Sequence, residues 1–372
     1  MLVVTDSRGG PTATQRISFE SPFSDGGASD RYQISFETEH SDQIAIATAL
    51  ASQSPDLVVL SRYTSLTGME WIAQARKAGI PVVFHIDDDL LAVPASLGDA
   101  KFNKYNDPAR IAALRENIEH SDLCYVSTHE LAKRFKEHGV ATAIVSGEIY
   151  CSVSPDEVGA LVPPATGPVI GYMGTAGHSA DLEMILPDIA AAMELLPTLN
   201  FELFGSVKMP PELTRFGRRV RHLPAVADYG QFRARLRSLG WWVGLAPLED
   251  NAFNRCKADT KWVEYSLAGA AVIASDLVVY RHACADGAGV LAKSAGEWAE
   301  AILGLIYRPG DRASMIEAAQ QKLRERYSHE RLRQQVVAIF DRAFATTAKA
   351  ARSAVTRRRA SPFPGEWLPR AD

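Results

Sequence analysis

The sequence predicts an α/β protein made of two Rossmann-like domains, each with a doubly wound parallel sheet. First, short apolar runs alternate with helical patterns over 2–146. Second, the alternation restarts at 169, after the stretch 152–168, whose richness in Pro, Gly, Ser and Val is typical of a linker. Third, 372 residues are enough for two domains that each bury a core. Alternating strands and helices with short apolar strands are typical of parallel sheets.

In the first half, apolar runs bounded by turn residues define the strands, and 3.6-residue periodicity defines the helices. The helix 66–78 ends at Gly79, with Pro81 just beyond, and the helix 130–138 ends at Gly139. The predicted strands are 2–5, 32–37, 56–60, 81–86, 123–127 and 143–146. The predicted helices are 42–52, 66–78, 108–120 and 130–138.

The second half repeats the pattern and adds long amphipathic helices at its end. The predicted strands are 169–173, 201–204, 220–223, 241–246, 271–275 and 289–291. The predicted helices are 181–196, 229–238, 259–268, 295–306, 311–325 and 329 to about 345. We therefore divide the chain into a first Rossmann-like domain (1–155), a second Rossmann-like domain (156–325), a C-terminal helix (326–346) and a basic, flexible tail (347–372).

Composition excludes several classes of protein. A hydrophobic content of 47% is too high for a wholly disordered chain. No apolar run approaches the roughly 20 residues that span a bilayer, and no signal-peptide pattern is visible. The cysteines form no C-x-x-C pair, which disfavours a zinc ribbon or a disulfide scaffold: Cys124, Cys151, Cys256 and Cys284. We expect a cytoplasmic protein that holds no metal.

The net charge of −4 is unevenly distributed. Residues 343–372 hold six basic and two acidic side chains, so that segment carries +4 and the rest of the chain −8. The acidic body argues against a protein that coats nucleic acid, and we expect no nucleic-acid partner. The basic tail is either a solvated end or a peripheral contact with the anionic inner face of a membrane.

Ligands of open parallel sheets bind beyond the carboxyl ends of the strands, so polar residues there are candidates. The first strand is followed by Arg8, Gly9 and Gly10, an acceptor-side loop or an ordinary turn. The strand 81–86 runs into an acidic turn, in which His85, Asp87 and Asp88 are candidate catalytic residues. Clustered carboxylates suit acceptor positioning or base chemistry better than metal binding here, because no second acidic cluster is evident. A solvated acidic turn is the alternative.

Two more candidates follow strands of the second domain. Gly174, Thr175 and His178 lie between a strand and a helix, where free backbone N–H groups favour a diphosphate. Their spacing is not the dinucleotide fingerprint, and a simple loop is the alternative. The segment 254–269 carries two lysines and two acidic residues at short spacing: Lys257, Asp259, Lys261 and Glu264. The lysines suit a diphosphate and a carboxylate suits ribose hydroxyls, whereas a surface salt bridge is the alternative.

The block 241–280 resembles the donor-binding region of GT-B glycosyltransferases, particularly the large retaining family four. That family has a strand, a helix bearing Lys and Glu, and then Gly-x-Pro-Val-Ile-Ala-Ser, which stands here as Gly-Ala-Ala-Val-Ile-Ala-Ser at 269–275. The segment 81–90 is similar to the strand that ends in an Asp-Asp-Asp turn in bacterial members. The resemblance covers nearly the whole chain and implies two domains facing across a cleft, with the last helix crossing back to the first domain. It implies that 1–155 is the acceptor-side domain and 156–325 the nucleotide-sugar donor domain.

The resemblance also implies residue roles. Glu264 matches the second Glu of the family's Glu-x7-Glu, which contacts ribose, but Cys256 stands where the first Glu is expected. The family's Arg-x4-Lys diphosphate clamp is not evident either, so we expect Lys257, Lys261 and the loop 174–178 to supply that charge. The implied reaction moves a sugar from a nucleotide-sugar, used as co-substrate without a further cofactor or metal, to a glycan or lipid-linked acceptor with retention.

Two other functions fit the same layout. A nucleotide-sugar epimerase shares the two-domain architecture and would interconvert its substrate without an acceptor. A degenerate, non-catalytic protein that binds a glycan or a partner protein would explain the missing first Glu.

Overall fold

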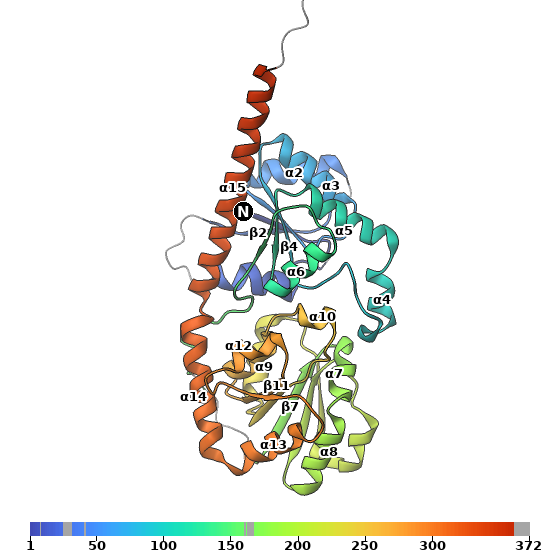
Figure 1. The fold of residues 1–372 in the computed structure, drawn as a ribbon, viewed down its shortest axis with the longest axis vertical. Helices are drawn as coiled ribbons and strands as arrows, with labels where there is room; N and C mark the ends of the chain where they lie inside the picture. The colour runs from blue at the N-terminus through green and yellow to red at the C-terminus, as the bar shows by residue number, and fades with distance from the viewer. Residues whose placement is uncertain (8, 25–31, 41, 160, 162–166, 361–372) are drawn as a thin grey trace, which may run out of the picture.

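The structure is a computed structural model that describes residues 1–7, 9–24, 32–40, 42–159, 161 and 167–360, with side chains through residue 348. Two parallel sheets of six strands lie one above the other along the long axis (Figure 1). Their strand orders are β2-β1-β3-β4-β5-β6 and β12-β11-β10-β7-β8-β9. Each sheet carries helices on both faces, as the sequence predicts for doubly wound domains.

The first domain contains every strand that the sequence predicts there. Its strands are β1 (Leu2–Val4), β2 (Ser35–Glu37), β3 (Val58–Ser61), β4 (Val82–Ile86), β5 (Leu123–Val126) and β6 (Ile144–Ser146). Its main helices are α2 (Gln43–Gln53), α3 (Thr67–Lys77), α5 (Pro108–His120) and α6 (His129–Glu137).

Two helical segments of the first domain were not predicted. One follows β1 and consists of α1 (Ala13–Gln15), η1 (Arg16–Glu20) and η2 (Ser21–Phe23). Gln15 starts it, because its side chain accepts a hydrogen bond from the backbone N–H of Thr12 in a capping box. The other follows β4 and consists of η3 (Ala95–Leu97) and α4 (Asp99–Tyr105). Both are too short to show a clear helical period in the sequence.

The second domain contains β7 (Val169–Gly174), β8 (Asn200–Gly205), β9 (Val220–Pro224), β10 (Val243–Ala246), β11 (Ala271–Ser275) and β12 (Val290–Ala292). Its helices are η5 (Ala176–His178), α7 (Ser179–Glu183), α8 (Leu186–Leu195), η6 (Pro211–Arg219), α9 (Tyr229–Ser238), α10 (Ala252–Arg255), α11 (Thr260–Leu267), α12 (Val278–Cys284), α13 (Glu297–Tyr307) and α14 (Pro309–Arg326). The predicted helix 181–196 is therefore two helices. Pro187 lies at the start of α8, since proline is tolerated in the first turn of a helix but not in its interior.

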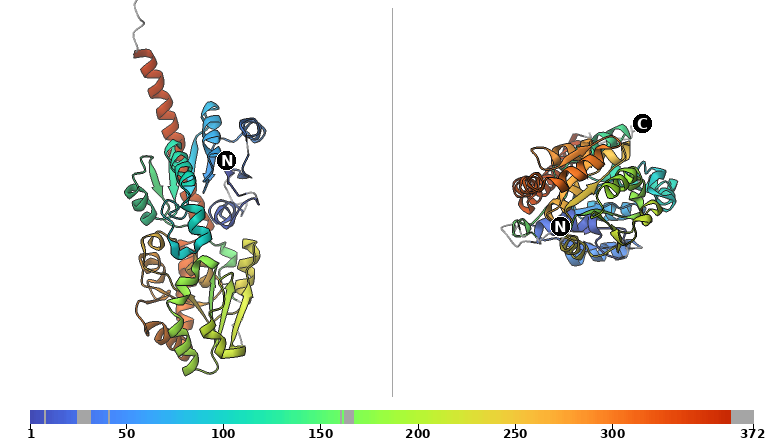
Figure 2. Two further views of the ribbon diagram at one scale, coloured as in Figure 1. Left: turned by 90° about the vertical axis from the view of Figure 1, so that its right-hand side faces the viewer. Right: turned by 90° about the horizontal axis from the view of Figure 1, so that it is seen from below.

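The last helix, α15 (His329–Ala360), returns along the first domain (Figures 1 and 2). Its buried face packs on the first sheet through Leu332, Val336 and Phe340, in one cluster with Met1 and Val3. Because α15 follows the last helix of the second domain and packs on the first domain, it connects the two domains. It continues through Ala360, so the backbone of the first part of the predicted tail is helical, and 361–372 lie outside the described residues.

The glycines of β7 and β10 leave room for aromatic rings at the centre of the second domain. A Cβ on Gly171 would lie 2.0 Å from the ring of Trp241, and a Cβ on Gly244 would lie 2.5 Å from that of Tyr265. We expect Gly171→Ala to lower the free energy of unfolding by about 1–3 kcal/mol or more, because no rotamer relieves an overlap with a buried ring. Urea unfolding of Gly171→Ala beside Gly310→Ala, where nothing lies within 4 Å, measures this. An equal midpoint for both variants would contradict it.

Candidate active site

A cleft of about 480 Å3 separates the carboxyl ends of the two sheets. Residues after β4 and β7 both line it, which places it beyond the strand ends of both domains. From the first domain it receives Ala13, Thr14, Ile17, Asp87, Asp88 and Tyr150. From the second it receives Met173, Gly174, Thr175, His178, Phe204, Gly205, Ser206, Ala225, Val226, Ala227, Tyr229, Phe232, Leu248, Lys257, Ala258, Thr260, Lys261, Glu264 and Tyr280.

Asp87 is held in place on the first-domain wall by three donors. Its carboxylate accepts hydrogen bonds from Thr14 Oγ1 at 2.9 Å, Arg62 at 2.6 Å and Tyr150 Oη at 2.7 Å. A carboxylate with three donors from other parts of the first domain is fixed in one orientation on this wall.

Asp88 links the two domains. Its carboxylate accepts from Arg62 at 3.1 Å and from Lys257 Nζ, on the opposite wall, at 3.4 Å. Burial opposes ionisation, but the charges of Lys257 and Arg62 lower the pKa of Asp88 below its usual range. Asp88 is therefore a permanent anion facing the lysines of the second domain.

His85 does not reach the cleft, which corrects the prediction that it contacts substrate. It is fully buried, packs edge-on against Phe19 at 4.7 Å, and shares a 3.0 Å hydrogen bond between Nδ1 and Ser61 Oγ. Burial lowers the pKa of His85 to about 4. Both faces of a parallel strand are covered, so even the penultimate residue of β4 lies in the core.

Lys257 and Lys261 enter the cleft on either side of the start of α11. Lys257 lies in the loop before the helix and Lys261 in its first turn, and both side chains line the same cavity. The ammonium of Lys261 lies 5.6 Å from the centroid of the Tyr172 ring, and it has no ion pair or hydrogen bond with any described residue. Burial lowers the pKa of Lys261 to about 8. The charges of Asp181 and Glu264 oppose this shift without forming an ion pair with Lys261.

Glu264 lies one helical turn beyond Lys261 and is only 8% exposed. Burial raises the pKa of Glu264 to about 7, and a hydrogen bond from Tyr229 and the charge of Arg233 oppose that shift. A carboxylate at the back of a cleft with few donors of its own suits a ligand that brings hydroxyl groups.

The loop after β7 closes the cleft beneath the lysines. His178 Nδ1 donates to Asp181 at 2.7 Å, because a carboxylate can only accept. The charge of Lys261, together with burial, lowers the pKa of His178 to about 4, so the ring is neutral at pH 7. Gly174 and Thr175 line the cavity beside it.

An aromatic surface forms the far end of the cleft, and sequence reasoning missed it. The rings of Phe204 and Phe232 stack with centroids 5.3 Å apart, and Tyr229 stacks on Phe232 at 6.1 Å. These side chains come from β8 and α9, which are far apart in sequence, so no local pattern could show them. Neither Trp241 nor Trp262 is among the residues that line the cleft.

Other predicted residues lie elsewhere. Asp259 faces away from the cleft and accepts a hydrogen bond from Tyr327 at 2.5 Å, which corrects its predicted place in the donor site. Gly9 and Gly10 are not among the residues that line the cleft, where the helical segment 13–17 takes their place. Arg8 lies outside the described residues.

Cys256, at the position of the family's first Glu, is 3% exposed and packs into the core cluster of the first domain with Phe253. Its backbone carbonyl accepts from Thr128 Oγ1 across the interface at 2.7 Å. Cys256 therefore contributes to the contact between the domains, and its thiol does not line the cleft.

Sequence reasoning also missed Arg62 and Tyr150, which both donate hydrogen bonds to Asp87. Arg62 follows β3 as Asp87 follows β4, so its position at a strand end was the available signal. Tyr150 lies in the stretch that leads out of the first domain, where no pattern marks it.

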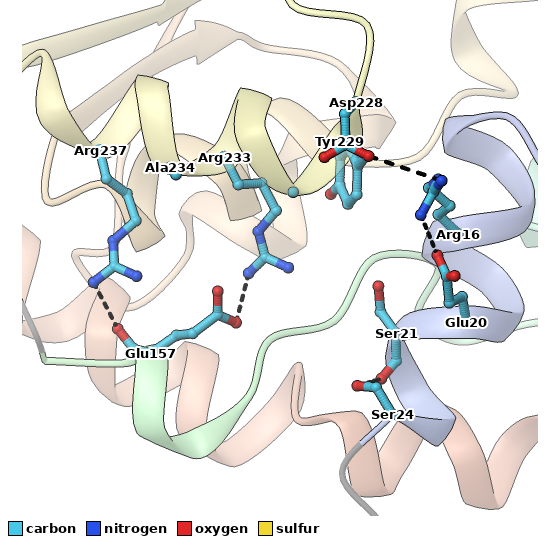
Figure 3. A pocket seen from close by; sticks show the side chains of 11 residues that line it. Arg16, Glu20, Ser21, Ser24, Glu157, Asp228, Tyr229, Arg233, Ala234 and Arg237 are labelled. Atoms are coloured by element: carbon cyan, nitrogen blue, oxygen red, sulfur yellow. Dashed lines mark hydrogen bonds and ion pairs between the residues drawn. The ribbon is translucent and has the colours of Figure 1, made fainter.

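A second cavity, of about 320 Å3, lies on the other side of Tyr229 (Figure 3). It separates the helical segment 13–24 from α9, and its charges are paired: Arg233 with Glu157 at 2.8 Å, and Arg16 with Asp228 at 3.8 Å. Within the described part of the chain, no group of three His, Cys, Asp or Glu side chains could hold a metal ion, and no helix is long and apolar enough to cross a membrane.

Several solved glycosyltransferases share this architecture at low sequence identity. Anabaena HepE, solved with UDP-glucose, is 14% identical, and the match covers 91% of this chain and 99% of HepE with a TM-score of 0.63. Sucrose-phosphate synthase from Thermosynechococcus elongatus is 14% identical, with 92% and 99% covered and a TM-score of 0.63. The pneumococcal O-GlcNAc transferase GtfA, solved with UDP and GlcNAc, is 15% identical, with 82% and 60% covered and a TM-score of 0.56.

The chain has the GT-B fold. Comparison with protein-family models and with curated proteins gives no match.

Proposed function

We propose that this protein is a glycosyltransferase that moves a sugar from a nucleotide-sugar to an acceptor hydroxyl. One observation carries the proposal: an aromatic surface, a buried carboxylate and two lysines of the second domain line the same cleft and adjoin one another. Tyr229 stacks on Phe232 and hydrogen-bonds Glu264, and Glu264 is one helical turn from Lys261. These groups suit the base, ribose and diphosphate of a nucleotide. HepE and GtfA, which share the fold, have been solved with UDP or UDP-glucose.

The second domain would bind the donor. The base packs against Phe204 and Phe232, and the ribose hydroxyls donate to Glu264. The diphosphate lies between Lys257 and Lys261, above the loop 174–178. As the sugar–phosphate bond breaks, negative charge develops on the leaving diphosphate, and fixed cations in a dry cleft stabilise it. We propose that lysines supply this charge without a metal ion.

The first domain would bind the acceptor. Despite the burial of Asp88, the charges of Lys257 and Arg62 lower its pKa, so this carboxylate is poorly suited to remove a proton at neutral pH. Asp87 is held in one orientation by three donors. We propose that both carboxylates orient the acceptor hydroxyl of a glycan or lipid-linked substrate and that transfer retains the anomeric configuration. The leaving phosphate then takes the proton of the attacking hydroxyl.

Calorimetry with the diphosphates of uridine, guanosine, adenosine, cytidine and thymidine tests the donor site first. We expect one of them to bind, and the matching nucleotide-sugars then serve as donors with and without an added glycan acceptor. Transfer, or slow hydrolysis of the donor, supports the proposal. No binding of any diphosphate would refute it, and interconversion of one nucleotide-sugar into its epimer without an acceptor would instead identify an epimerase.

A further inference from the structure

The segment η3–α4 extends from the first domain to the second. It follows the acidic turn after β4, and η3 packs against both η5 and α7 (Figure 1). Most of α4 is exposed, including Lys101, Phe102 and Lys104. The segment η3–α4 therefore lies beside the loop 174–178 of the second domain, although it belongs to the first domain.

Its closest approach is at Gly177, in the loop 174–178. A Cβ on Gly177 would lie 2.7 Å from Lys101 Nζ and 3.3 Å from the carbonyl oxygen of Leu97. Only glycine leaves this space, so the missing side chain allows the ammonium of Lys101 to sit against the loop. The flanking residues Thr175 and His178 line the cleft itself.

The charges around Lys101 favour an anion. Lys101 has no ion pair or hydrogen bond with any described residue, although Lys257 and Arg62 are close enough to act on its charge. Although Lys101 is exposed as a residue, partial desolvation of its ammonium, followed by the charge of Lys257, lowers the pKa of Lys101, and Asp88 opposes this. Asp88 is already shared by Arg62 and Lys257. Arg62 also pairs with Asp87 at 2.6 Å. Three cations from the two domains therefore lie near two carboxylates, which leaves one positive charge without a partner among the described residues.

We propose that Lys101 binds the diphosphate of the donor from the first domain, opposite Lys257 and Lys261. This inference rests on the proposed function. A diphosphate between these lysines replaces repulsion across the interface with attraction on both sides. The diphosphate would then connect the two domains at this point.

Lys101→Ala tests this, with Lys104→Ala as the matched control. Lys104 lies on the same helix and is exposed, with its ammonium 5.0 Å from the centroid of its neighbour Tyr105. Both variants remove one positive charge from α4. For the nucleoside diphosphate that the wild type binds, we expect Lys101→Ala to raise the Kd about tenfold, which is the usual effect of losing one charged hydrogen bond. Lys104→Ala should change the same Kd less than twofold.

The parent nucleoside distinguishes a phosphate contact from a change in structure. Its Kd should be equal in the wild type and Lys101→Ala, because it lacks the diphosphate. Equal losses for nucleoside and diphosphate, or equal Kd values for the two lysine variants, would overturn the inference and leave the proposed function intact. Failure of the wild type to bind any diphosphate would instead overturn the proposed function.

Gly177→Ala provides a second test that removes no charge. The added Cβ displaces the ammonium of Lys101, so diphosphate binding should weaken several-fold. In the Lys101→Ala background the obstructed group is gone, and the same substitution should have a smaller effect. Additive losses would show that Gly177 and Lys101 act separately and would contradict the proposal.

Discussion

Replacing Lys261 with alanine is expected to lower kcat/KM for sugar transfer about 100-fold or more, which is the usual effect of losing one group that stabilises charge in the transition state. Lys261 is a buried cation of the cleft, and no described carboxylate lies within ion-pair distance of it, although the charges of Asp181 and Glu264 act on it. Its N–H groups are therefore available to the leaving diphosphate. Steady-state kinetics with the donor that the diphosphate panel identifies measure the effect. Most of the loss should be in kcat, since charge on the leaving group develops as the bond breaks.

Lys133→Ala is the control for this substitution. Lys133 is 67% exposed and pairs only with its neighbour Glu130 on the surface of α6, so kcat/KM should stay within twofold of the wild type. Lys261→Arg keeps the charge and should recover part of the activity. A fully active Lys261→Ala enzyme would show that the diphosphate does not bind at the start of α11.

Glu264→Gln is expected to weaken binding of the nucleotide-sugar donor by about 1–3 kcal/mol and to change the pH dependence of kcat/KM. In the wild type, Glu264 ionises near pH 7 and Lys261 loses its proton near pH 8. Ribose hydroxyls need the ionised carboxylate, and the diphosphate needs the charged lysine. The profile should therefore be a narrow bell with limbs near these two values, and Glu264→Gln should lose the acid limb.

Glu264→Gln is also expected to change the stability of the folded protein, in a direction that depends on pH. The pKa of Glu264 in the folded protein, about 7, lies above its ordinary value of 4.5. The group therefore stabilises folding fully below pH 4.5, and this contribution is lost as the pH rises through 7. At pH 8, Glu264→Gln should unfold at a higher temperature than the wild type. Glu194→Gln, on an exposed glutamate, should show neither effect. An unchanged acid limb in Glu264→Gln would remove Glu264 from the site.

The parallel strands, and the residues that follow their carboxyl ends, could be predicted from the sequence alone. Parallel strands are short apolar runs, and their carboxyl ends meet at one edge of the sheet. That rule is enough to place Asp87, Asp88, Lys257, Lys261 and Glu264 near one another, and all five line the cleft. The predicted return of the last helix to the first domain has a counterpart in the packing of α15 on the first sheet.

What sequence reasoning missed depends on the direction of side chains and on contacts between distant segments. His85 and Asp87 are two residues apart, yet one lies in the core and the other in the cleft, because the strand ends between them. Asp259 lies between two cleft lysines but faces Tyr327, which comes from the end of α14. The aromatic surface and the contact of Lys101 with Gly177 join elements that only the tertiary fold brings together.

A crystal structure of the protein with its nucleoside diphosphate tests the central claim most directly. The account predicts the base against Phe204 and Phe232, ribose hydroxyls within hydrogen-bond distance of Glu264, and phosphate oxygens within reach of Lys257 and Lys261. A diphosphate bound elsewhere, for example in the cavity between Arg16 and Arg233, with no nucleotide in the cleft beside α11, would contradict it.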